Sequence, residues 1–275
     1  MNPTFSMLAA SALTLAAALW FSFRFAWWRK SVPATVPRIL MYHMVSHPVR
    51  GLRFNKMRVS PALFKRQIAW LHQEGWTFCF LSELFRDTAT ENTKRVVLTF
   101  DDGYRDNLLQ ALPVLKAFQA KASLFPVVNR ADGYDWSTLK KAGHGEGELG
   151  RESKLTDAEI TEMLTSGLIE IGGHSLTHAN LPVLNAADAW REIAGCKSAL
   201  ESAFGVPAHT FCYPFGLYGA REVELVEKAG FIAAVTTKQG IDVANRFTCS
   251  RIKISGTEGM FAFRLRIRTG KRGPG

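Results

Sequence analysis

Residues 95–104 read RVVLTFDDGY, an apolar run that ends in two adjacent carboxylates, Asp101 and Asp102, and a glycine. The apolar run is typical of a buried strand. Two carboxylates this close together stay ionised cheaply only if a cation neutralises them. Because successive strand residues point to opposite faces, one aspartate would hold a metal while the other faces the reacting group. The alternative is an Asp-Asp cap at the start of a helix.

A second apolar run also ends in residues that bind metals. Residues 169–178 read IEIGGHSLTH, with His174 and His178 four positions apart. On one helical turn this spacing would present both imidazoles to one ion, although a lone histidine is more often structural. One aspartate and two histidines would leave a coordination position open for water, as a catalytic zinc-type site requires.

The alternation of apolar runs with amphipathic segments indicates the fold class. We expect strands at 38–44, 77–80, 95–100, 122–128, 168–171, 209–213, 231–236 and 249–254, and helices at 60–72, 107–118, 156–165, 185–204 and 220–229. This order is typical of an α/β protein with a parallel sheet. An open sheet and an incomplete (β/α) barrel both fit, and in both the active site lies at the carboxyl ends of the strands.

Composition limits the classes of partner. The 275 residues, 47% of them hydrophobic, suffice for one large domain or two small ones. The net charge of +10 indicates either solubility or attraction to an anionic surface, such as lipid head groups or a phosphate-bearing substrate. Aromatic and basic residues are not interleaved as in RNA-binding modules, so we expect no nucleic-acid partner. The four cysteines lie far apart, which excludes a zinc knuckle and favours buried thiols.

The N-terminus is predicted to be a membrane anchor. Met1–Phe23 contains no charged side chain, and its apolar run is long enough to span a bilayer. Tryptophans and basic residues follow, as at a membrane interface: Arg24, Trp27, Trp28, Arg29 and Lys30. A cleaved signal peptide carries its positive charge before the apolar run, so a retained single-pass anchor in the inner membrane is favoured over a signal peptide or a buried helix. The basic flank favours a cytoplasmic catalytic domain, with a periplasmic one left open.

Three motifs carry a resemblance to a known family. TFDDGY at 99–104, HSLTH at 174–178 and YPFG at 213–216, in this order, resemble the polysaccharide deacetylase family, also called the NodB-homology or carbohydrate esterase 4 family. The resemblance covers about residues 38–256 and implies a distorted (β/α)7-type barrel of mostly parallel strands. RILMYH at 38–43 and GVPAHTFCYPFG at 205–216 are most similar to the bacterial branch that acts on β-1,6-linked or lipid-linked amino sugars.

The resemblance implies a role for each motif residue. Asp101 would be the general base, and Asp102, His174 and His178 would hold a divalent metal, most often zinc, with cobalt, nickel or iron as alternatives. A metal-bound water would then hydrolyse the N-acetyl group of an amino sugar. A backbone N–H near Phe215 would stabilise the oxyanion.

The chain departs from the family pattern at three places. Cys212 occupies the position where the third motif often has an arginine that orients the catalytic aspartate. No tryptophan follows Trp190, and no histidine follows His209, so the usual general acid of the last motif is absent or replaced. His43, at the end of the first predicted strand, is our candidate for that acid, with a packing role as the alternative.

Sugar rings need flat apolar faces beside polar groups, so aromatic residues in predicted loops near strand ends are candidates for stacking on the substrate: Tyr104, Tyr134, Trp136 and Tyr218. Tyr213 and Phe215 of the third motif are candidates for a wall of the site and for contact with substrate or oxyanion. The expected substrate is an N-acetylated glycan or a polyprenyl-linked amino sugar at the membrane. A degenerate member that binds glycan without catalysis and a metal-dependent phosphoesterase are the alternatives. The sequence predicts no oligomeric state.

These features divide the chain into segments. We expect an anchor with its basic flank at 1–30, a linker at 31–37, the catalytic domain at 38–258 and a basic C-terminal tail at 259–275. Because residues 261–275 carry five basic side chains and no acid, the tail is predicted to be solvated. A polar, glycine-rich segment at 133–153 is predicted to be a surface insertion.

Overall fold

The computed structural model describes residues 3–86, 93–131, 133, 136 and 147–271, with the side chains of Met7 and of residues from 10 onward. Residues 134–135 and 137–146, which make up much of the predicted insertion at 133–153, lie outside the described residues.

The strands of the described residues form one eight-stranded sheet in the order β5-β4-β3-β1-β8-β7-β6, with β2 beside β3. Its strands are β1 Arg38–Tyr42, β2 Thr77–Phe78, β3 Arg95–Asp102, β4 Ala122–Pro126, β5 Ile169–Ile171, β6 Thr210–Cys212, β7 Ala233–Gln239 and β8 Cys249–Lys253. All registered strand pairs are parallel. The predicted parallel α/β class is therefore confirmed.

The sheet curls until its two outer strands meet. A parallel bridge joins Gly173, just beyond β5, to Phe211 of β6. There the Gly173 N–H donates to the Thr210 carbonyl and the Cys212 N–H donates to the Gly173 carbonyl, each over 2.8 Å. The result is a nearly closed barrel, as the resemblance implied.

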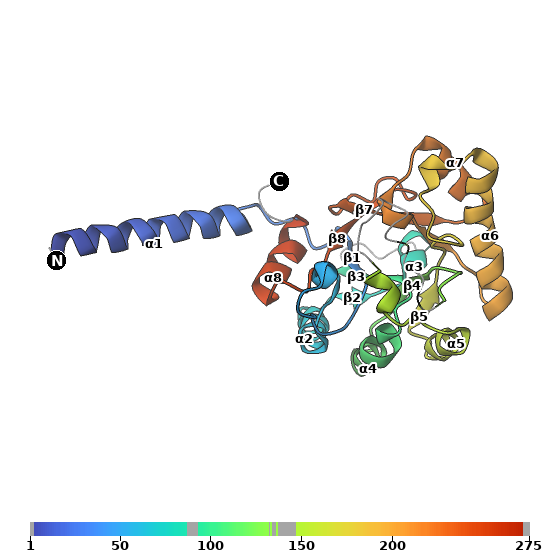
Figure 1. The fold of residues 1–275 in the computed structure, drawn as a ribbon, viewed down its shortest axis with the longest axis horizontal. Helices are drawn as coiled ribbons and strands as arrows, with labels where there is room; N and C mark the ends of the chain where they lie inside the picture. Colours follow the sequence, from blue (N-terminus) through green and yellow to red (C-terminus); the bar gives the residue numbers. More distant parts are fainter. Residues whose placement is uncertain (1–2, 87–92, 132, 134–135, 137–146, 272–275) are drawn as a thin grey trace.

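Helices surround the barrel (Figure 1). They are α2 Pro61–Gln73, α4 Leu112–Phe118, α5 Asp157–Thr165, α6 Ala186–Phe204, α7 Ala220–Lys228 and α8 Met260–Thr269. Several begin at a side-chain cap, which satisfies backbone N–H groups that lack a helical partner. The Ser60 hydroxyl accepts from Leu63 N, and Thr156 forms the predicted capping box with Glu159. Single turns of 3-10 helix lie in the loops: η1 Arg53–Met57, η4 Leu149–Arg151, η5 Leu181–Val183 and η6 Pro214–Gly216.

The helix predicted at 107–118 is divided in two. It begins as a π-helix, η2 Asn107–Ala111, and continues as α4. Pro113 has no N–H to donate to the Leu109 carbonyl, and its ring would clash there in a regular α-helix, so a wider turn precedes it. Within η2, the buried Asn107 donates through Nδ2 to the His43 carbonyl over 2.9 Å. The start of this helix is thus tied to the loop after β1.

Strand alternation divides the apolar side chains between two cores. Leu40, Leu98 and Phe100 pack outward against α2, where Phe64 and Ile68 are buried. The intervening residues face the inside of the barrel, and they form a second cluster with two leucines of α3 Leu81–Arg86: Ile39, Val97, Phe125, Cys212, Val235, Cys249, Leu81 and Leu84. The sequence did not predict α3, whose leucines close the amino end of the barrel. All four cysteines are buried and unpaired, as predicted.

The N-terminal helix α1, Pro3–Phe25, projects away from the barrel (Figure 1). Within the part of the chain that the structure describes, no helix has the length and hydropathy needed to cross a bilayer, so the predicted transmembrane anchor is not supported.

The basic segment predicted as a solvated tail is folded over residues 260–269. Phe263 and Ile267 of α8 are buried, and Phe263 packs edge-on against Trp70 of α2 with ring centroids 5.8 Å apart. The buried Arg266 forms an ion pair with Glu258, which explains how a basic helix can lie against the core. The prediction of a solvated tail was wrong here because it counted charges without their partners.

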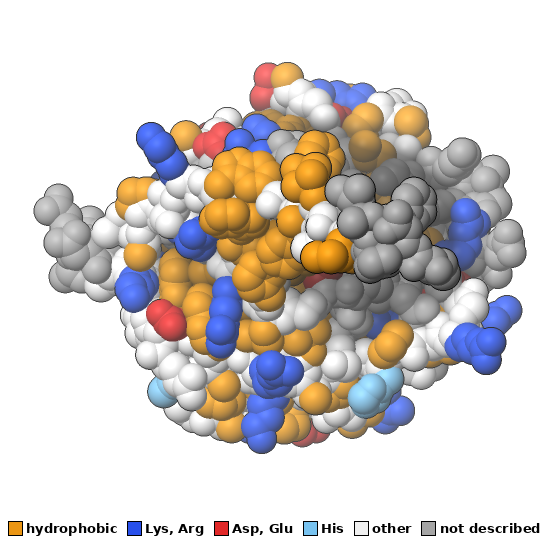
Figure 2. Space-filling model, turned by 90° about the vertical axis from the view of Figure 1, so that its left-hand side faces the viewer, with side chains coloured by type: hydrophobic (Ala, Val, Ile, Leu, Met, Phe, Trp, Pro, Cys, Tyr) orange, Lys and Arg blue, Asp and Glu red, His pale blue; other side chains and the backbone are white. Residues whose placement is uncertain are grey.

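The end of α1 rests on α8. The Phe261 ring lies 5.5 Å from Phe21 and 5.2 Å from Phe25, and Arg24 forms a 2.8 Å ion pair with Glu258. Figure 2 shows this side of the molecule, where apolar side chains gather at the centre and Lys and Arg side chains lie around them.

Candidate active site

Both aspartates of the DDG sequence reach the same cavity at the carboxyl end of the barrel. Val97, Thr99 and Asp101 lie two residues apart along β3, so their side chains share its inward face. Asp101 therefore points into the open end of the barrel. Asp102 would point outward in a regular strand. Its φ of 74° turns the backbone, and both carboxylates line one cavity. Positive φ is rare for a residue with a side chain, and it marks strain of the kind found at functional sites.

Asp102 and the two histidines converge, as predicted. The Asp102 Oδ1 atom lies 3.3 Å from His174 Nε2 and 3.4 Å from His178 Nε2. One ligand atom from each of the three buried residues lies within 4.8 Å of the others. A carboxylate and two imidazoles suit zinc and other divalent transition metals, and the arrangement leaves a side open toward the cavity.

The two histidines do not share a helical turn, so that detail of the prediction was wrong. The segment after β5 is an irregular loop, with φ of 62° at Ser175 and 59° at His178. Glu192 of α6 holds this loop by accepting hydrogen bonds from Leu176 N and Thr177 N, each over 2.9 Å. The histidines therefore meet through a loop conformation and not through helical periodicity.

The backbone of β6 orients one imidazole of the candidate metal site. His174 donates from Nδ1 to the Cys212 carbonyl over 2.7 Å, which leaves Nε2 to face Asp102. Hydrogen bonds of this kind fix the tautomer and the ring orientation of a metal ligand. Gly173 makes the close approach possible, because a Cβ there would lie 2.9 Å from Cys196 Sγ and 3.0 Å from the Phe211 ring.

Arg251 is a site residue that the sequence analysis missed. It comes from β8 and forms a two-pronged ion pair with Asp101, with Nη1–Oδ1 of 2.7 Å and Nη2–Oδ2 of 2.8 Å. Nη1 also donates to the Thr99 hydroxyl over 2.9 Å, and Nη2 lies 3.3 Å from Cys212 Sγ. Both charged side chains are buried. The arginine that is absent at position 212 is thus supplied by another strand.

This ion pair controls the charge of Asp101. Burial alone raises the pKa of that carboxyl, but the guanidinium of Arg251 outweighs it and brings the pKa of Asp101 below its ordinary value. Asp101 is therefore ionised at neutral pH and can accept a proton.

His43 lies at the same edge of the sheet, just beyond β1. Its Nε2 atom is 3.8 Å from Asp101 Oδ2, and its side chain is 19% exposed, more than the other residues around Asp101. Asn107 holds the His43 carbonyl, which positions the loop. The structure thus brings His43 to the cavity, with its ring edge toward solvent.

The cavity has a volume of about 170 Å³. Its lining comprises the predicted residues and several others from the surrounding loops: His43, Phe54, Met57, Asp101, Asp102, Trp136, Leu149, His174, His178, Tyr213, Phe215 and Thr237. Phe215 has a φ of 58° and places its ring edge-on to His178, with centroids 4.3 Å apart. Trp136 lies on the other side of the same imidazole, at 5.2 Å.

Tyr104 is not in this cavity, contrary to the prediction of substrate contact there. It is 1% exposed and lies behind Trp136, with ring centroids 6.3 Å apart. Its ring lines a neighbouring cavity instead. Trp136, Tyr213 and Phe215 line the cavity that holds the aspartates and histidines. Tyr218 stacks on Tyr213 and is not among the lining residues, and Tyr134 lies outside the described residues.

Comparison with known proteins identifies the family. The polysaccharide deacetylase family model matches residues 88–234, more than half of the chain. The chain is 29% identical over 252 residues to "Putative polysaccharide deacetylase YxkH" of Bacillus subtilis (strain 168), covering 90% of this chain and 77% of that protein. It is 25% identical over 261 residues to the poly-beta-1,6-N-acetyl-D-glucosamine N-deacetylase of Escherichia coli (strain K12), covering 84% of this chain but 38% of the relative.

A solved structure agrees with the fold. The crystal structure of a polysaccharide deacetylase from Bacillus cereus superposes with a TM-score of 0.68 at 27% sequence identity. The superposition covers 84% of this chain and 69% of that one.

Proposed function

Since the chain belongs to the polysaccharide deacetylase family, we propose that it is a metal-dependent hydrolase that removes N-acetyl groups from amino sugars of a glycan. One observation carries the proposal. Asp102, His174 and His178 converge on a common point, and the ionised Asp101 lines the same cavity. A glycan-binding protein would need no ionised base at that position.

A divalent metal, most often zinc in sites of this donor type, would be held by Asp102, His174 and His178, and it would supply an activated water and polarise the amide carbonyl. Asp101 accepts the proton of the attacking water, since Arg251 keeps it ionised. His43, whose ring reaches both solvent and Asp101, donates a proton to the departing amine. The backbone N–H of Phe215 would stabilise the developing oxyanion. The Gly216 and Leu217 N–H groups of the same turn donate to the Tyr213 and Pro214 carbonyls.

The size of the cavity supports a small reacting group. Its volume of about 170 Å³ is below the roughly 300–1,000 Å³ of pockets that enclose a drug-sized ligand, so it would take an acetamido group and part of one sugar ring. Trp136 and Tyr213 offer aromatic faces to that ring. The Escherichia coli relative is named for an N-acetylglucosamine polymer, and we propose the same class of substrate, polymeric or lipid-linked.

The predicted location at the inner membrane stays a proposal. Exposed apolar side chains of α1 and of the turn after it, with basic residues around them, support contact with an anionic lipid surface: Leu13, Leu15, Leu19, Trp20 and Phe23 of α1, and Trp27 and Trp28 of the turn. Fractionation of cells that produce the full chain, compared with a chain that starts at residue 31, tests it. Equal amounts of both proteins in the soluble fraction would contradict the proposal.

Acetate release tests the function. The metal-loaded wild-type protein should release acetate from N-acetylglucosamine oligomers, and removal of the metal with a chelator should abolish the release. An Asp101→Asn variant should lose the activity while it still binds the metal. If both proteins release equal traces, the degenerate glycan-binding alternative holds.

The phosphoesterase alternative is disfavoured by the ligands. Among the described residues, the structure contains one group of three His, Cys, Asp or Glu side chains that could hold a metal, whereas two-metal phosphate chemistry needs a second. Release of phosphate from an aryl phosphate, measured in the same assay buffer, would revive this alternative.

A further inference from the structure

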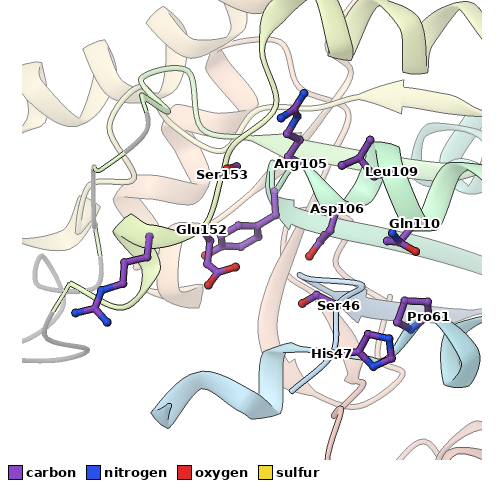
Figure 3. A pocket seen from close by; sticks show the side chains of 11 residues that line it. Ser46, His47, Pro61, Arg105, Asp106, Leu109, Gln110, Glu152 and Ser153 are labelled. Atoms are coloured by element: carbon purple, nitrogen blue, oxygen red, sulfur yellow. The ribbon is translucent and has the colours of Figure 1, made fainter. Parts of the chain in front are cut away.

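A second, larger cavity of about 420 Å³ opens beside the candidate active site. This volume lies within the range of pockets that bind small ligands. The cavity lies between three loops that follow β1, follow β3 and precede α5 (Figure 3), and it is lined by Ser46, His47, Pro61, Tyr104, Arg105, Asp106, Leu109, Gln110, Arg151, Glu152 and Ser153. No step of the proposed reaction uses it.

The half-buried Asp106 gives this cavity a negatively charged group. Its carboxylate accepts a hydrogen bond from Asn107 Nδ2 over 2.9 Å, and Figure 3 shows Ser46 facing it. Within the described residues no ion pair involves Asp106, and burial raises its pKa to about 6. The site therefore holds a carboxylate that lacks a cation of its own.

The other charged side chains near Asp106 are either paired or at the rim. Arg105 forms an ion pair with Glu159 over 2.6 Å, and Glu152 forms one with the buried Arg58 over 2.7 Å. His47 and Arg151 are exposed. Among the described residues at the floor of the cavity, Asp106 is thus the charged side chain that forms no ion pair.

We propose that this second cavity binds a hexosamine unit with a free amino group, through an ion pair between its ammonium group and Asp106. The inference rests on the proposed function, because N-deacetylation produces such units in the glycan chain. Gln110 and Ser153 offer hydrogen bonds to sugar hydroxyls, and Leu109 and Pro61 offer apolar contact. Charge-assisted hydrogen bonds of this kind are about twice as strong as neutral ones.

Residues that line the two cavities contact one another, so one glycan chain would occupy both. Asn107 Nδ2 contacts both Asp106 and the carbonyl of His43, each over 2.9 Å. Tyr104 lines the second cavity and packs against Trp136, which lines the first. A deacetylated unit in the second cavity would therefore hold a neighbouring acetylated unit beside Asp101 and His43.

Isothermal titration with two non-acetylated oligomers tests this inference separately from catalysis. One probe is a hexamer of β-1,6-linked glucosamine, and the other is the glucose hexamer of the same linkage, which lacks the amines. We expect the wild-type protein to bind the glucosamine hexamer at least about tenfold more tightly, and Asp106→Asn to remove that difference. Glu162→Gln, which removes an exposed carboxylate of α5 outside the cavity, should keep it.

A second variant guards against misfolding of Asp106→Asn. Leu109 is 54% exposed at the cavity, so Leu109→Arg should fold, and its positive charge should weaken glucosamine binding by a similar factor. Equal affinity of the wild-type protein for the two hexamers, or a difference that survives both cavity variants, would overturn the inference. Since neither hexamer carries an acetyl group, an absence of acetate release in the earlier assay would refute the deacetylase function without affecting this measurement.

Discussion

The two ends of the barrel are built from the same strands and have opposite characters. At the amino end, Ile39 and Val97 pack against Leu81 and Leu84 of α3 in an apolar cluster. At the carboxyl end, the inward positions of β3 and β8 carry Asp101 and Arg251. In a parallel barrel, residues at the amino ends of the strands therefore serve stability, and residues at the carboxyl ends serve catalysis. Substitutions at the amino end should lower the unfolding free energy, and substitutions at the carboxyl end should lower the catalytic rate.

The largest effect should come from the metal ligands. His178→Ala removes one of three ligands, and since a bound metal contributes several kcal/mol to the transition state, acetate release should fall at least about 10³-fold. Elemental analysis should find the metal lost from the purified variant. His72→Ala, at an exposed position of α2, serves as the control and should keep both metal and activity.

His43→Gln removes the proposed proton donor at the carboxyl end of the barrel and leaves the three candidate metal ligands in place. General acid catalysis contributes about 10²–10⁴-fold, so kcat should fall within that range while the metal content stays at the wild-type level. A less than threefold change in kcat would assign the proton to another group and leave His43 with a packing role.

Arg251→Met should change both stability and catalysis, because Arg251 is buried and also contacts Asp101 in the site. Removal of one partner of a buried ion pair costs about 3–5 kcal/mol of unfolding free energy, which urea denaturation measures. The pKa of Asp101 lies below its ordinary value because of Arg251, so loss of the guanidinium raises it, and the base is ionised only at higher pH. The acidic limb of the kcat/KM profile should move upward in pH.

Arg251→Lys is the matched variant, since it keeps the charge and loses the two-pronged geometry. It should shift the acidic limb less than Arg251→Met does. Identical pH profiles for the wild-type protein and both variants would show that Arg251 serves stability alone.

The smallest effect on catalysis should come from the amino end. Leu81 is fully buried, so Leu81→Ala should cost about 2–5 kcal/mol of unfolding free energy. Its kcat/KM should stay within about twofold of the wild-type value below the melting temperature, since Leu81 lies at the end of the barrel opposite the candidate active site. Val183→Ala, at a 75% exposed position of η5, should leave both quantities unchanged. A large loss of activity in Leu81→Ala would mean that the two ends are coupled.

Strand positions and the identity of the main site residues could be predicted from sequence. Apolar runs that stop at polar residues predict strand ends, and parallel strands bring those ends to one edge. This logic placed Asp101, Asp102, His174 and His178 together, and it put His43 on the same edge.

Arg251 could not be predicted in this way, because its partner lies 150 residues earlier in the chain. The contact depends on β8 lying beside β1 in the sheet order, which no local pattern records. The one available signal was a basic residue within a predicted buried strand, since a buried arginine requires a partner.

Local backbone geometry was the second source of error. The i and i+4 spacing of the histidines suggested a helical turn, but positive φ at Ser175 and His178 produces the same convergence in a loop. The short helix α3 has six residues, too few for a periodic pattern to identify. Both features are settled by tertiary packing and not by local sequence preference.

The joint between β5 and β6 closes the barrel and also positions one imidazole of the candidate metal site. The Cys212 residue that closes this joint through its N–H also receives the His174 imidazole at its carbonyl. A fluctuation that parts the two strands would therefore tilt a ligand away from its neighbours. By the same thermodynamic cycle, an ion bound to those ligands would stabilise the contact between β5 and β6. Ion affinity and barrel closure would then be thermodynamically coupled.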